Sequence, residues 1–327
     1  MNAAKITAID YYLPETLLSN EVLCEEFPDW SVDKISAKTG IHSRRIASES
    51  ECSSDLAVQA ANKLFSQGVD RSKIDFILFC TQSPDYFLPT TACILQERLE
   101  LPTSTGALDF NLGCSGYISG LGLAKGLIDS GQASGVLLLT GETYSKFLDP
   151  EDRSVRTIFG DGASATFLTG EQSESAAIGP FIYGTDGSGA KNLIVKGGAF
   201  RDSDGSADPH LRMNGSEIFS FTLKSIPLLV QQTLTKAKLK VEDVDWFVFH
   251  QANKFMLEHL RDKIGIPEEK FAISLEKCGN TVSSSIPIAL KELSVAGKLK
   301  PGQKVMAVGF GVGYSWGATI IEWREQP

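Results

Sequence analysis

Two stretches of this sequence share one pattern and decide its fold class: IDFILFCTQ at residues 74–82 and VDWFVFHQA at residues 244–252. Each is a short apolar run, rich in branched and aromatic residues, that ends in polar residues, which is typical of a buried β-strand. The second begins 170 residues (244 − 74) after the first, about half of the 327-residue chain. The likeness therefore indicates an internal duplication.

The segments downstream of these strands repeat in the same order: a small-residue turn with a cysteine, a helical stretch and a second buried strand. They read FNLGCSGYISG and then VLLLTGE in the first half, and SLEKCGNTVSS and then VMAVGFG in the second. Chance likeness between buried strands would not keep both order and spacing. The sequence thus predicts an α/β fold of two duplicated halves, 1–172 and 173–327, with Cys114 and Cys278 at matching turns.

Other periodic segments complete the alternation of strands and helices. We predict strands at 74–80 and 135–142, and helices at 53–68 and 115–131. Glycines crowd one side of the last helix, so we expect it to pack closely against another backbone. Residues 184–216 are rich in Gly, Asp and Ser. Loops of that length are usually functional or mobile, so we expect this segment at the rim of the active site.

The composition excludes several classes of function. A formal net charge of −9 argues against nucleic-acid binding, which needs a basic field. No apolar run is long enough for a membrane span, and the first residues lack a secretory signal, so we expect a cytoplasmic protein. The six cysteines and four histidines show no ligand spacing, and we therefore expect no metal.

Cys114 is the candidate nucleophile. It lies between an apolar strand and the glycine-rich helix, in the stretch NLGCSG. At a helix N-terminus, the macrodipole and unpaired N–H groups lower the pKa of a thiol and favour the nucleophilic thiolate. We therefore expect a lowered pKa for Cys114, although a cysteine at such a turn is, by itself, more often structural than catalytic.

Two polar residues follow the matching elements of the second half. His250 comes directly after the strand WFVF, at the sheet edge where α/β proteins usually bind ligands. Taken alone, it fits a catalytic residue and a buried core histidine equally well. Asn280 belongs to a Gly-Asn turn signal, but that turn duplicates the one at Cys114, and matching turns of a duplicated fold meet near each other.

A glycine-rich turn, GFGVGY at residues 309–314, follows the apolar strand VMAV. No βαβ unit comes after it, so it is not a dinucleotide fingerprint. A glycine turn at a strand end can instead present backbone N–H groups to a developing oxyanion.

Together these segments resemble the β-ketoacyl-acyl-carrier-protein synthase III family of thiolase-like condensing enzymes. The motifs TGIHSRRI, ALDFNLGCSG, DPEDR, FGDGASA, HQAN, GNT and GFGVGYSWG occur in the order and spacing of that family, over nearly the whole chain. The resemblance implies a five-layered αβαβα fold of the thiolase type and a homodimer. It implies no bound cofactor, since acyl-CoA and acyl-carrier-protein thioesters serve as substrates.

The resemblance also implies a mechanism, decarboxylative Claisen condensation in a fatty-acid or a specialised acyl or polyketide pathway. Cys114 would take an acyl group from acyl-CoA or acyl carrier protein. His250 and Asn280 would hydrogen-bond the thioester carbonyl of a malonyl-carrier protein as CO₂ leaves, and the enolate would attack the acyl-cysteine. Backbone N–H groups of Cys114 and Gly313 would hold the tetrahedral oxyanion.

Four further residues would contact the substrate by the same resemblance: Arg153, Asn253, Gly215 and Leu88. Arg153 would engage the nucleotide of coenzyme A. Leu88 would reach across the dimer to close the acyl pocket, where the family usually has an aromatic residue.

Three more positions depart from the family's pattern and leave the acyl group open. Lys34 stands where a tryptophan stacks on the coenzyme A adenine, with Trp30 nearby but out of register. Phe255 replaces an arginine that engages the acidic carrier protein, and Leu112-Gly113 replaces the usual two alanines before the nucleophile.

The main alternative is acyl transfer from acyl-Cys114 to a hydroxyl or amine without decarboxylation, which does not need the asparagine. Hydroxymethylglutaryl-CoA synthase and thiolase fit less well, because the first relies on a glutamate near the nucleophile and the second on another active cysteine. An inactive partner subunit would lack the nucleophile, and no cysteine-protease signature is present.

Overall fold

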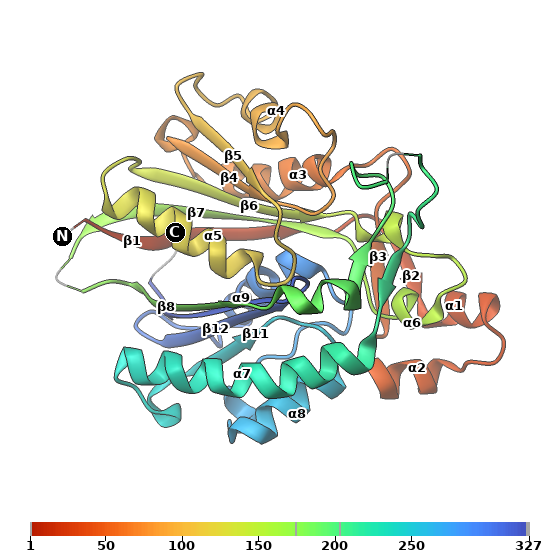
Figure 1. Ribbon diagram of the computed structural model, residues 1–327. Helices are drawn as coiled ribbons and strands as arrows, with labels where there is room; N and C mark the ends of the chain where they lie inside the picture. Colours follow the sequence, from red (N-terminus) through yellow and green to blue (C-terminus); the bar gives the residue numbers. More distant parts are fainter. Residues whose placement is uncertain (1, 174, 203, 325–327) are drawn as a thin grey trace.

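The structure, a computed structural model that describes residues 2–173, 175–202 and 204–324, contains two mixed β-sheets with helices between and outside them (Figure 1). The first sheet has the strand order β1-β7-β6-β4-β5 and the second β11-β12-β13-β8. Their bounds are β1 (Asn2–Tyr12), β4 (Phe76–Cys80), β5 (Gly106–Phe110), β6 (Gly135–Glu142), β7 (Gly162–Gln172), β8 (Ile178–Thr185), β11 (Trp246–Phe249), β12 (Lys304–Gly311) and β13 (Ser315–Glu322).

The two sheets repeat one arrangement, which confirms the predicted duplication. In the first, β4 runs parallel to β6, and β6 runs antiparallel to β7; β11, β12 and β13 are related in the same way. The edge strands β1 and β8 pair antiparallel with β7 and β13. The division at residues 172 and 173 would fall between β7 and β8, and it stays a prediction.

One repeated aspartate helps to align each sheet. Asp75 precedes β4, and its carboxylate accepts hydrogen bonds from the N–H groups of Ser134 (2.6 Å) and Gly135 (3.1 Å), at the start of β6. Asp245 precedes β11 and accepts from the Lys304 N–H at the start of β12 (2.8 Å). The same residue therefore ties the same pair of parallel strands in both halves, because it satisfies strand-end donors that have no ladder partner.

The helices form three layers around the sheets, which confirms the five-layered fold (Figure 1). Between the sheets lie α5 (Gly116–Asp129) and α9 (Ser285–Val295), whose apolar faces join one buried core with both sheets. The outer face of the first sheet carries α3 (Ser53–Ser66) and α4 (Thr91–Arg98). The outer face of the second carries α7 (Gly215–Ala237) and α8 (Lys254–Ile264).

The predicted elements agree with the structure to within two residues. Strand β6 has the predicted bounds, and β4 begins two residues later than predicted. Helix α3 begins at the predicted residue, and α5 begins one residue later than predicted. Both helices end two residues earlier than predicted. The prediction that the α5 glycines pack against another backbone is wrong, because the atoms closest to Gly120 and Gly122 belong to side chains. A Cβ on Gly120 would meet the Leu138 side chain at 2.5 Å, and one on Gly122 would meet the Tyr183 hydroxyl at 2.0 Å.

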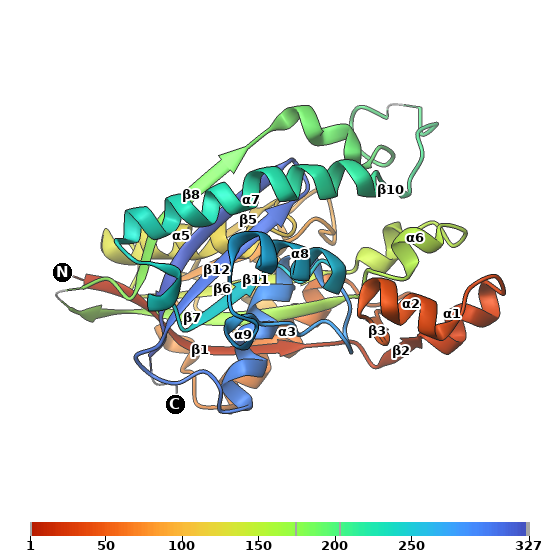
Figure 2. The same ribbon diagram turned by 90° about the horizontal axis from the view of Figure 1, so that it is seen from below.

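Smaller elements gather at one side of the two sheets (Figure 2). They comprise β2 (Thr16–Ser19), α1 (Asn20–Glu26), α2 (Val32–Thr39), β3 (Ser43–Ile46) and α6 (Arg153–Arg156). The predicted excursion 184–216, of which residue 203 lies outside the described residues, contains the short hairpin of β9 (Leu193–Val195) and β10 (Leu211–Met213).

Two features are absent from the residues that the structure describes. No helix in this part of the chain is both long and apolar enough to cross a membrane. Within the same residues, no group of three or more His, Cys, Asp or Glu side chains is arranged to hold a metal ion.

Candidate active site

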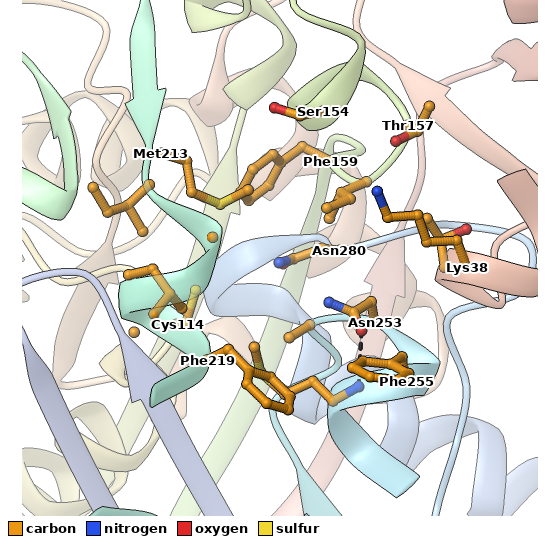
Figure 3. Close-up of a pocket in the computed structure, with 18 of the residues that line it drawn as sticks. Lys38, Cys114, Ser154, Thr157, Phe159, Met213, Phe219, Asn253, Phe255 and Asn280 are labelled. Carbon is orange, nitrogen blue, oxygen red and sulfur yellow. Dashed lines mark hydrogen bonds between the residues drawn. The ribbon is translucent and has the colours of Figure 1, made fainter. Parts of the chain in front are cut away.

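A cavity of about 410 Å³ brings the three candidate residues together. Cys114, His250 and Asn280 all line it, although they come from three turns far apart in the sequence. In Figure 3, Cys114 lies at one side of the cavity, Lys38 and Thr157 lie at the other, and Asn280 lies between them. Met213 and Gly215 also line it, so the segment 184–216 reaches the rim, as predicted.

Cys114 is held just before the N-terminus of α5, as the sequence predicts, and only 5% of it is exposed. The opposite wall is close: a Cβ on Gly311 would lie 2.9 Å from the Cys114 Cβ and 3.1 Å from its Sγ. Glycine is therefore required in β12 for the thiol to fit, since real Cβ atoms do not approach that closely.

The expected lowering of the Cys114 pKa is wrong. Burial, and after it the charge of Glu142, raise the pKa of this thiol above its usual range, and the smaller effect of its own backbone N–H does not offset them. The sequence suggested the helix N-terminus but not the enclosure of the thiol, and loss of solvent disfavours the thiolate. The resting nucleophile is therefore a neutral thiol.

Glu142, at the end of β6, is a buried carboxyl group that the sequence did not single out. Its Oε2 accepts hydrogen bonds from the Gln82 N–H (3.0 Å) and the Ser83 hydroxyl (3.2 Å), and its Oε1 accepts from the Ser283 hydroxyl (2.9 Å). Burial raises its pKa to about 8, against the opposing effect of these hydrogen bonds. Glu142 thus links the strand ends of the first half to the Asn280 turn of the second.

His250 follows β11 and is buried. Its ring meets Phe310 edge-on, with 5.6 Å between the ring centroids, and its Nδ1 lies 2.7 Å from the Ser285 hydroxyl. Burial lowers the pKa of His250 to about 3, more than the backbone of Val282 raises it. The imidazole is therefore neutral at physiological pH, so that it can offer a hydrogen bond without a positive charge.

Asn280 is fixed on both its backbone and its side chain. Its N–H donates to the Ile158 carbonyl (2.9 Å), and its carbonyl accepts from the Gly160 N–H (3.1 Å). Its Oδ1 accepts from the Val282 N–H at 2.9 Å. Because a backbone N–H can only donate, the amide oxygen faces Val282, which leaves the two Nδ2 hydrogens for a ligand.

The glycine turn that was predicted to hold an oxyanion joins β12 to β13. The Tyr314 N–H donates to the Asp186 carbonyl (2.7 Å), and the Ser315 hydroxyl donates to the Val312 carbonyl (2.8 Å). The Ser315 and Ser115 hydroxyls are 2.7 Å apart. Ser115 follows the nucleophile, so this contact fixes the turn around Gly313 relative to Cys114.

The four residues predicted to contact substrate divide into two pairs. Asn253 and Gly215 line the cavity, and Asn253 also caps α8, where its Oδ1 accepts from the Met256 N–H (2.9 Å). Arg153 and Leu88 do not line it. Arg153 opens α6, 3.8 Å from the Asp29 carboxylate, and its neighbour Ser154 lines the cavity instead; Leu88 is 87% exposed.

Trp30, which is out of register in the sequence, nevertheless lines the cavity together with Lys38. The ammonium groups of Lys34 and Lys38 lie 5.4 and 5.6 Å from the centroid of its ring. The Arg153 guanidinium lies 5.5 Å from the ring of Phe27. A net-negative chain thus carries an indole and several cations at the mouth of this cavity.

A second cavity, of about 900 Å³, lies on the other side of Leu193, which lines both. Gln82, Tyr144, Val312, Gly313 and Phe87 are among its lining residues. The Tyr144 hydroxyl donates to Gln82 Oε1 (2.7 Å), and a Cβ on Gly113 would lie 2.4 Å from the same oxygen. The contact with Gln82 therefore explains why this chain has glycine at position 113 where the family usually has alanine, since an alanine Cβ would collide with Gln82.

Besides Glu142, sequence reasoning missed Ser285 and Val282, which contact His250 and Asn280. The run of three serines after GNT was the available signal. Serines at the start of a helix next to a Gly-Asn turn usually cap the helix, so the run did not stand out.

Comparisons with known proteins agree with this geometry. Residues 108–187 match the family profile of 3-oxoacyl-[acyl-carrier-protein (ACP)] synthase III, and residues 234–323 match that of its C-terminal part. The chain is 40% identical over 327 residues to the beta-ketoacyl-[acyl-carrier-protein] synthase III of Clostridium perfringens, with 98% of this chain and 100% of that protein covered.

Solved structures give the same result. A crystal structure of 3-oxoacyl-(acyl-carrier-protein) synthase III has a TM-score of 0.96 and 52% identity, with 98% of this chain and 100% of that one covered. The enzyme from Pseudomonas aeruginosa has a TM-score of 0.92 and 32% identity, with 99% of both chains covered. The fold, the grouping of Cys114, His250 and Asn280, and these likenesses lead to one conclusion: the chain belongs to the β-ketoacyl-[acyl-carrier-protein] synthase III family.

Proposed function

We propose that this protein condenses a Cys114-bound acyl group with a malonyl-carrier-protein thioester, with loss of CO₂. One observation carries the proposal: a single cavity holds a thiol together with two neutral side chains that can donate hydrogen bonds. A thiol serves covalent acyl transfer. Neutral donors serve the negative charge that develops on a thioester oxygen as a carboxylate is lost.

The first half-reaction is transfer of the acyl group to Cys114. The Cys114 sulfur attacks the carbonyl carbon of the acyl thioester, and the carbon–sulfur bond to the donor breaks. Because the resting thiol is protonated, its proton ends on the departing thiol of the donor. No resident cofactor takes part, since both substrates are already activated as thioesters.

The second half-reaction is decarboxylation. His250 and Asn280 donate hydrogen bonds to the thioester oxygen of the malonyl group, and the bond to the carboxylate breaks to give CO₂ and an enolate. One such donor typically lowers a barrier by about 3–4 kcal/mol. The low pKa of His250 supports its role as a neutral donor.

Carbon–carbon bond formation completes the cycle. The enolate carbon attacks the acyl carbon on Cys114, and the negative charge on the tetrahedral oxygen meets the backbone N–H groups of Cys114 and Gly313. Collapse of this intermediate expels the Cys114 sulfur as a thiolate and releases the 3-oxoacyl thioester, and the thiolate then takes one proton from solvent to restore the resting thiol. The contact between Ser115 and Ser315 supports a fixed spacing of the two N–H groups.

The mouth of the cavity suits a phosphate-bearing carrier. Trp30 offers an aromatic face, and Lys34 and Lys38 offer charges to the phosphates of coenzyme A or of phosphopantetheine. We propose that Trp30 takes the place of the family's stacking tryptophan, with Arg153 beside it. An acyl carrier protein is the second expected partner, and the exposed ring of Phe255 stands at its approach.

We also propose a cytoplasmic homodimer, with an acyltransferase activity of the synthase III type. Tyr86, Phe87 and Leu88 are three consecutive large apolar residues, all exposed in the single chain. Exposed apolar patches of this kind mark protein interfaces. Phe87 also lines the second cavity, so a partner subunit at this surface would help to enclose an acyl chain.

The test has two stages. Incubation with a panel of acyl-CoAs and acyl-carrier proteins should add the mass of one acyl group at Cys114. Addition of malonyl-carrier protein should then release CO₂ and a 3-oxoacyl product. Labelling without CO₂ from any malonyl donor would instead favour acyl transfer to a hydroxyl or amine, and no labelling of Cys114 by any thioester would exclude both reactions.

A further inference from the structure

The Ser285 hydroxyl contacts one ring nitrogen of His250. Its Oγ lies 2.7 Å from His250 Nδ1, and His250 lines the cavity. Nε2 is therefore the ring nitrogen left for a substrate. A neutral imidazole carries one proton, so the state of Nδ1 decides whether Nε2 donates or accepts a hydrogen bond.

The surroundings of Ser285 determine where its single hydroxyl proton can go. The Gln251 N–H lies 3.3 Å from Oγ and can only donate to it. The Val282 carbonyl lies 3.0 Å from Oγ and can only accept. That carbonyl also accepts the backbone N–H of Ser285 itself, so it stays satisfied if the hydroxyl proton points elsewhere. The shorter contact, to His250 Nδ1, is therefore available to that proton.

We propose that Ser285 is a positioning residue that donates its hydroxyl proton to His250 Nδ1 and so keeps the other ring proton on Nε2, where it faces the substrate. The inference rests on the proposed function in one respect: a donor at Nε2 is what a developing thioester enolate needs. The opposite tautomer, with Nδ1–H directed at Ser285 or at the nearby Val282 carbonyl, would present a lone pair to the cavity.

Asn280 is oriented by the same short turn. The Val282 N–H fixes its amide oxygen, and the Val282 carbonyl accepts from the backbone N–H of Ser285. Val282 is buried and has a φ of 53°, a conformation that β-branched residues rarely adopt. Strain of this kind persists where the surroundings over-determine it, often at active sites. One turn, residues 282–285, thus sets the donor direction of both side chains.

The direct test is ¹⁵N NMR of the wild-type protein at neutral pH, with the His250 signals identified by their loss in a His250→Gln variant. The proposal predicts a proton on Nε2 and a bare Nδ1. A protonated Nδ1 in the wild type would overturn it. This measurement needs no substrate and no activity, so it stands apart from the proposed function. An Nε2 proton without CO₂ release from any malonyl donor would refute the function and leave the tautomer assignment intact.

Variants then test the role of the hydroxyl. Ser285→Ala should move His250 to the Nδ1–H tautomer or to a mixture, and it should slow CO₂ release roughly ten-fold, the size of one lost hydrogen bond. Acylation of Cys114 should not change. Ser285→Thr keeps a hydroxyl and should restore the tautomer. An unchanged tautomer in Ser285→Ala would contradict the assigned role.

Ser284→Ala is the matched control. Ser284 is the adjacent buried serine, but its hydroxyl contacts the Thr140 hydroxyl (2.8 Å) and the Gly162 carbonyl (3.2 Å). This variant removes the same atom from the same turn without a contact to His250, so the tautomer should stay on Nε2. An equal shift in both variants would mean that the effect is general loosening of the turn, which would overturn the proposal.

Discussion

The turns that precede α5 and α9 occupy matching positions in the duplicated fold but carry different chemical groups, a nucleophile in the first and a hydrogen-bond donor in the second. The first carries Cys114, packed against Gly311 in an enclosure that keeps its thiol protonated. The second carries Asn280 on a dense set of hydrogen bonds, in which Ser283 contacts Glu142, Ser284 contacts Thr140 and Ser285 contacts His250.

The difference teaches how one architecture can serve two half-reactions. A nucleophile must be free to form a bond, and a thiol needs only space and an approach path. Donors must point in one fixed direction before charge develops, since electrostatic stabilisation depends on preorganisation. Accordingly, the turn in the first half is flanked by small residues, and its duplicate in the second half is held in place by hydrogen bonds from polar side chains.

The largest effect should come from removing the nucleophile. Cys114→Ala should abolish labelling by acyl-CoA and lower condensation on the order of 10⁴-fold or more. Decarboxylation of the malonyl thioester should survive, because the two hydrogen-bond donors, His250 and Asn280, remain. Mass spectrometry and CO₂ release measure the two activities separately.

Cys278→Ala is the control for that experiment, because Cys278 occupies the matching turn and is also buried. It should still take up one acyl group. Labelling that persists in Cys114→Ala, or that disappears in Cys278→Ala, would show that the chemistry has been assigned to the wrong half.

A smaller effect should follow from crowding the first turn. In Gly113→Ala the new Cβ would lie 2.4 Å from Gln82 Oε1 and 2.8 Å from Val312 Cγ1. Such overpacking typically costs about 1–3 kcal/mol, and we expect acylation of Cys114 to slow roughly ten-fold. Stopped-flow acylation and thermal melting would measure the two consequences.

The double variant Gly113→Ala/Gln82→Ala should recover part of the loss, because it removes the nearer of the two obstructing atoms and leaves Val312 Cγ1. Gln82→Ala alone leaves the Tyr144 hydroxyl without its acceptor. Together with the wild type, Gly113→Ala and the double variant, it completes a double-mutant cycle. Simple additivity of the two single changes would mean that they do not interact, contrary to the close contact.

The link between the two turns can be tested at Glu142. Its charge raises the pKa of Cys114, and this carboxyl group is mostly ionised only above its own pKa of about 8. Glu142→Gln should therefore lower the pKa of Cys114 and speed its alkylation at pH 9 by a factor of roughly 3 to 10. Iodoacetamide labelling followed by mass spectrometry would measure the rate. Slower or unchanged alkylation would exclude the electrostatic role.

The same variant has a predicted effect on stability. The folded-state pKa of Glu142 is raised to about 8 from its ordinary 4.5, so the folded protein holds this proton more tightly than the unfolded chain. The wild type should therefore lose this contribution as the pH rises from about 4.5 through 8. Glu142→Gln should remove that part of the slope, as thermal melting across this range would reveal; a wild-type slope of the opposite sign would be inconsistent with the burial of the carboxyl group.

The smallest effect is expected in α5, away from the chemistry. A Cβ on Gly126 would meet nothing within 4 Å, so Gly126→Ala should stabilise the fold by roughly 0.5–1 kcal/mol through helix propensity. Gly120→Ala, in the same helix, would meet Leu138 at 2.5 Å and should destabilise it. Melting temperatures that shift in the same direction would contradict this assignment.

Sequence reasoning reached the fold and the three central residues because those features are periodic or repeated. The paired strands, the matched turns and the Asp75 and Asp245 positions all recur at nearly the same offset. The protonation state of Cys114 could not be obtained in this way. It depends on how the chain encloses the thiol and on Glu142, which lies at the end of another strand.

The residues that surround the site could not be predicted from the sequence for a similar reason. Ser285 and Trp30 act through contacts made in three dimensions, and neither has a distinctive local pattern. Leu88 and Arg153 were assigned by resemblance alone, and in the single chain neither lines the cavity that holds Cys114.

The division of work between the two turns is the central claim, and Asn280→Ala tests it most directly when both half-reactions are measured on the same preparation. We predict that Cys114 acylation stays within roughly a factor of three of the wild type, because the first turn is untouched. CO₂ release from malonyl-carrier protein should fall roughly 10²- to 10³-fold, the typical loss for one oxyanion donor. An equal fall in both rates, or CO₂ release at the wild-type rate, would contradict the account.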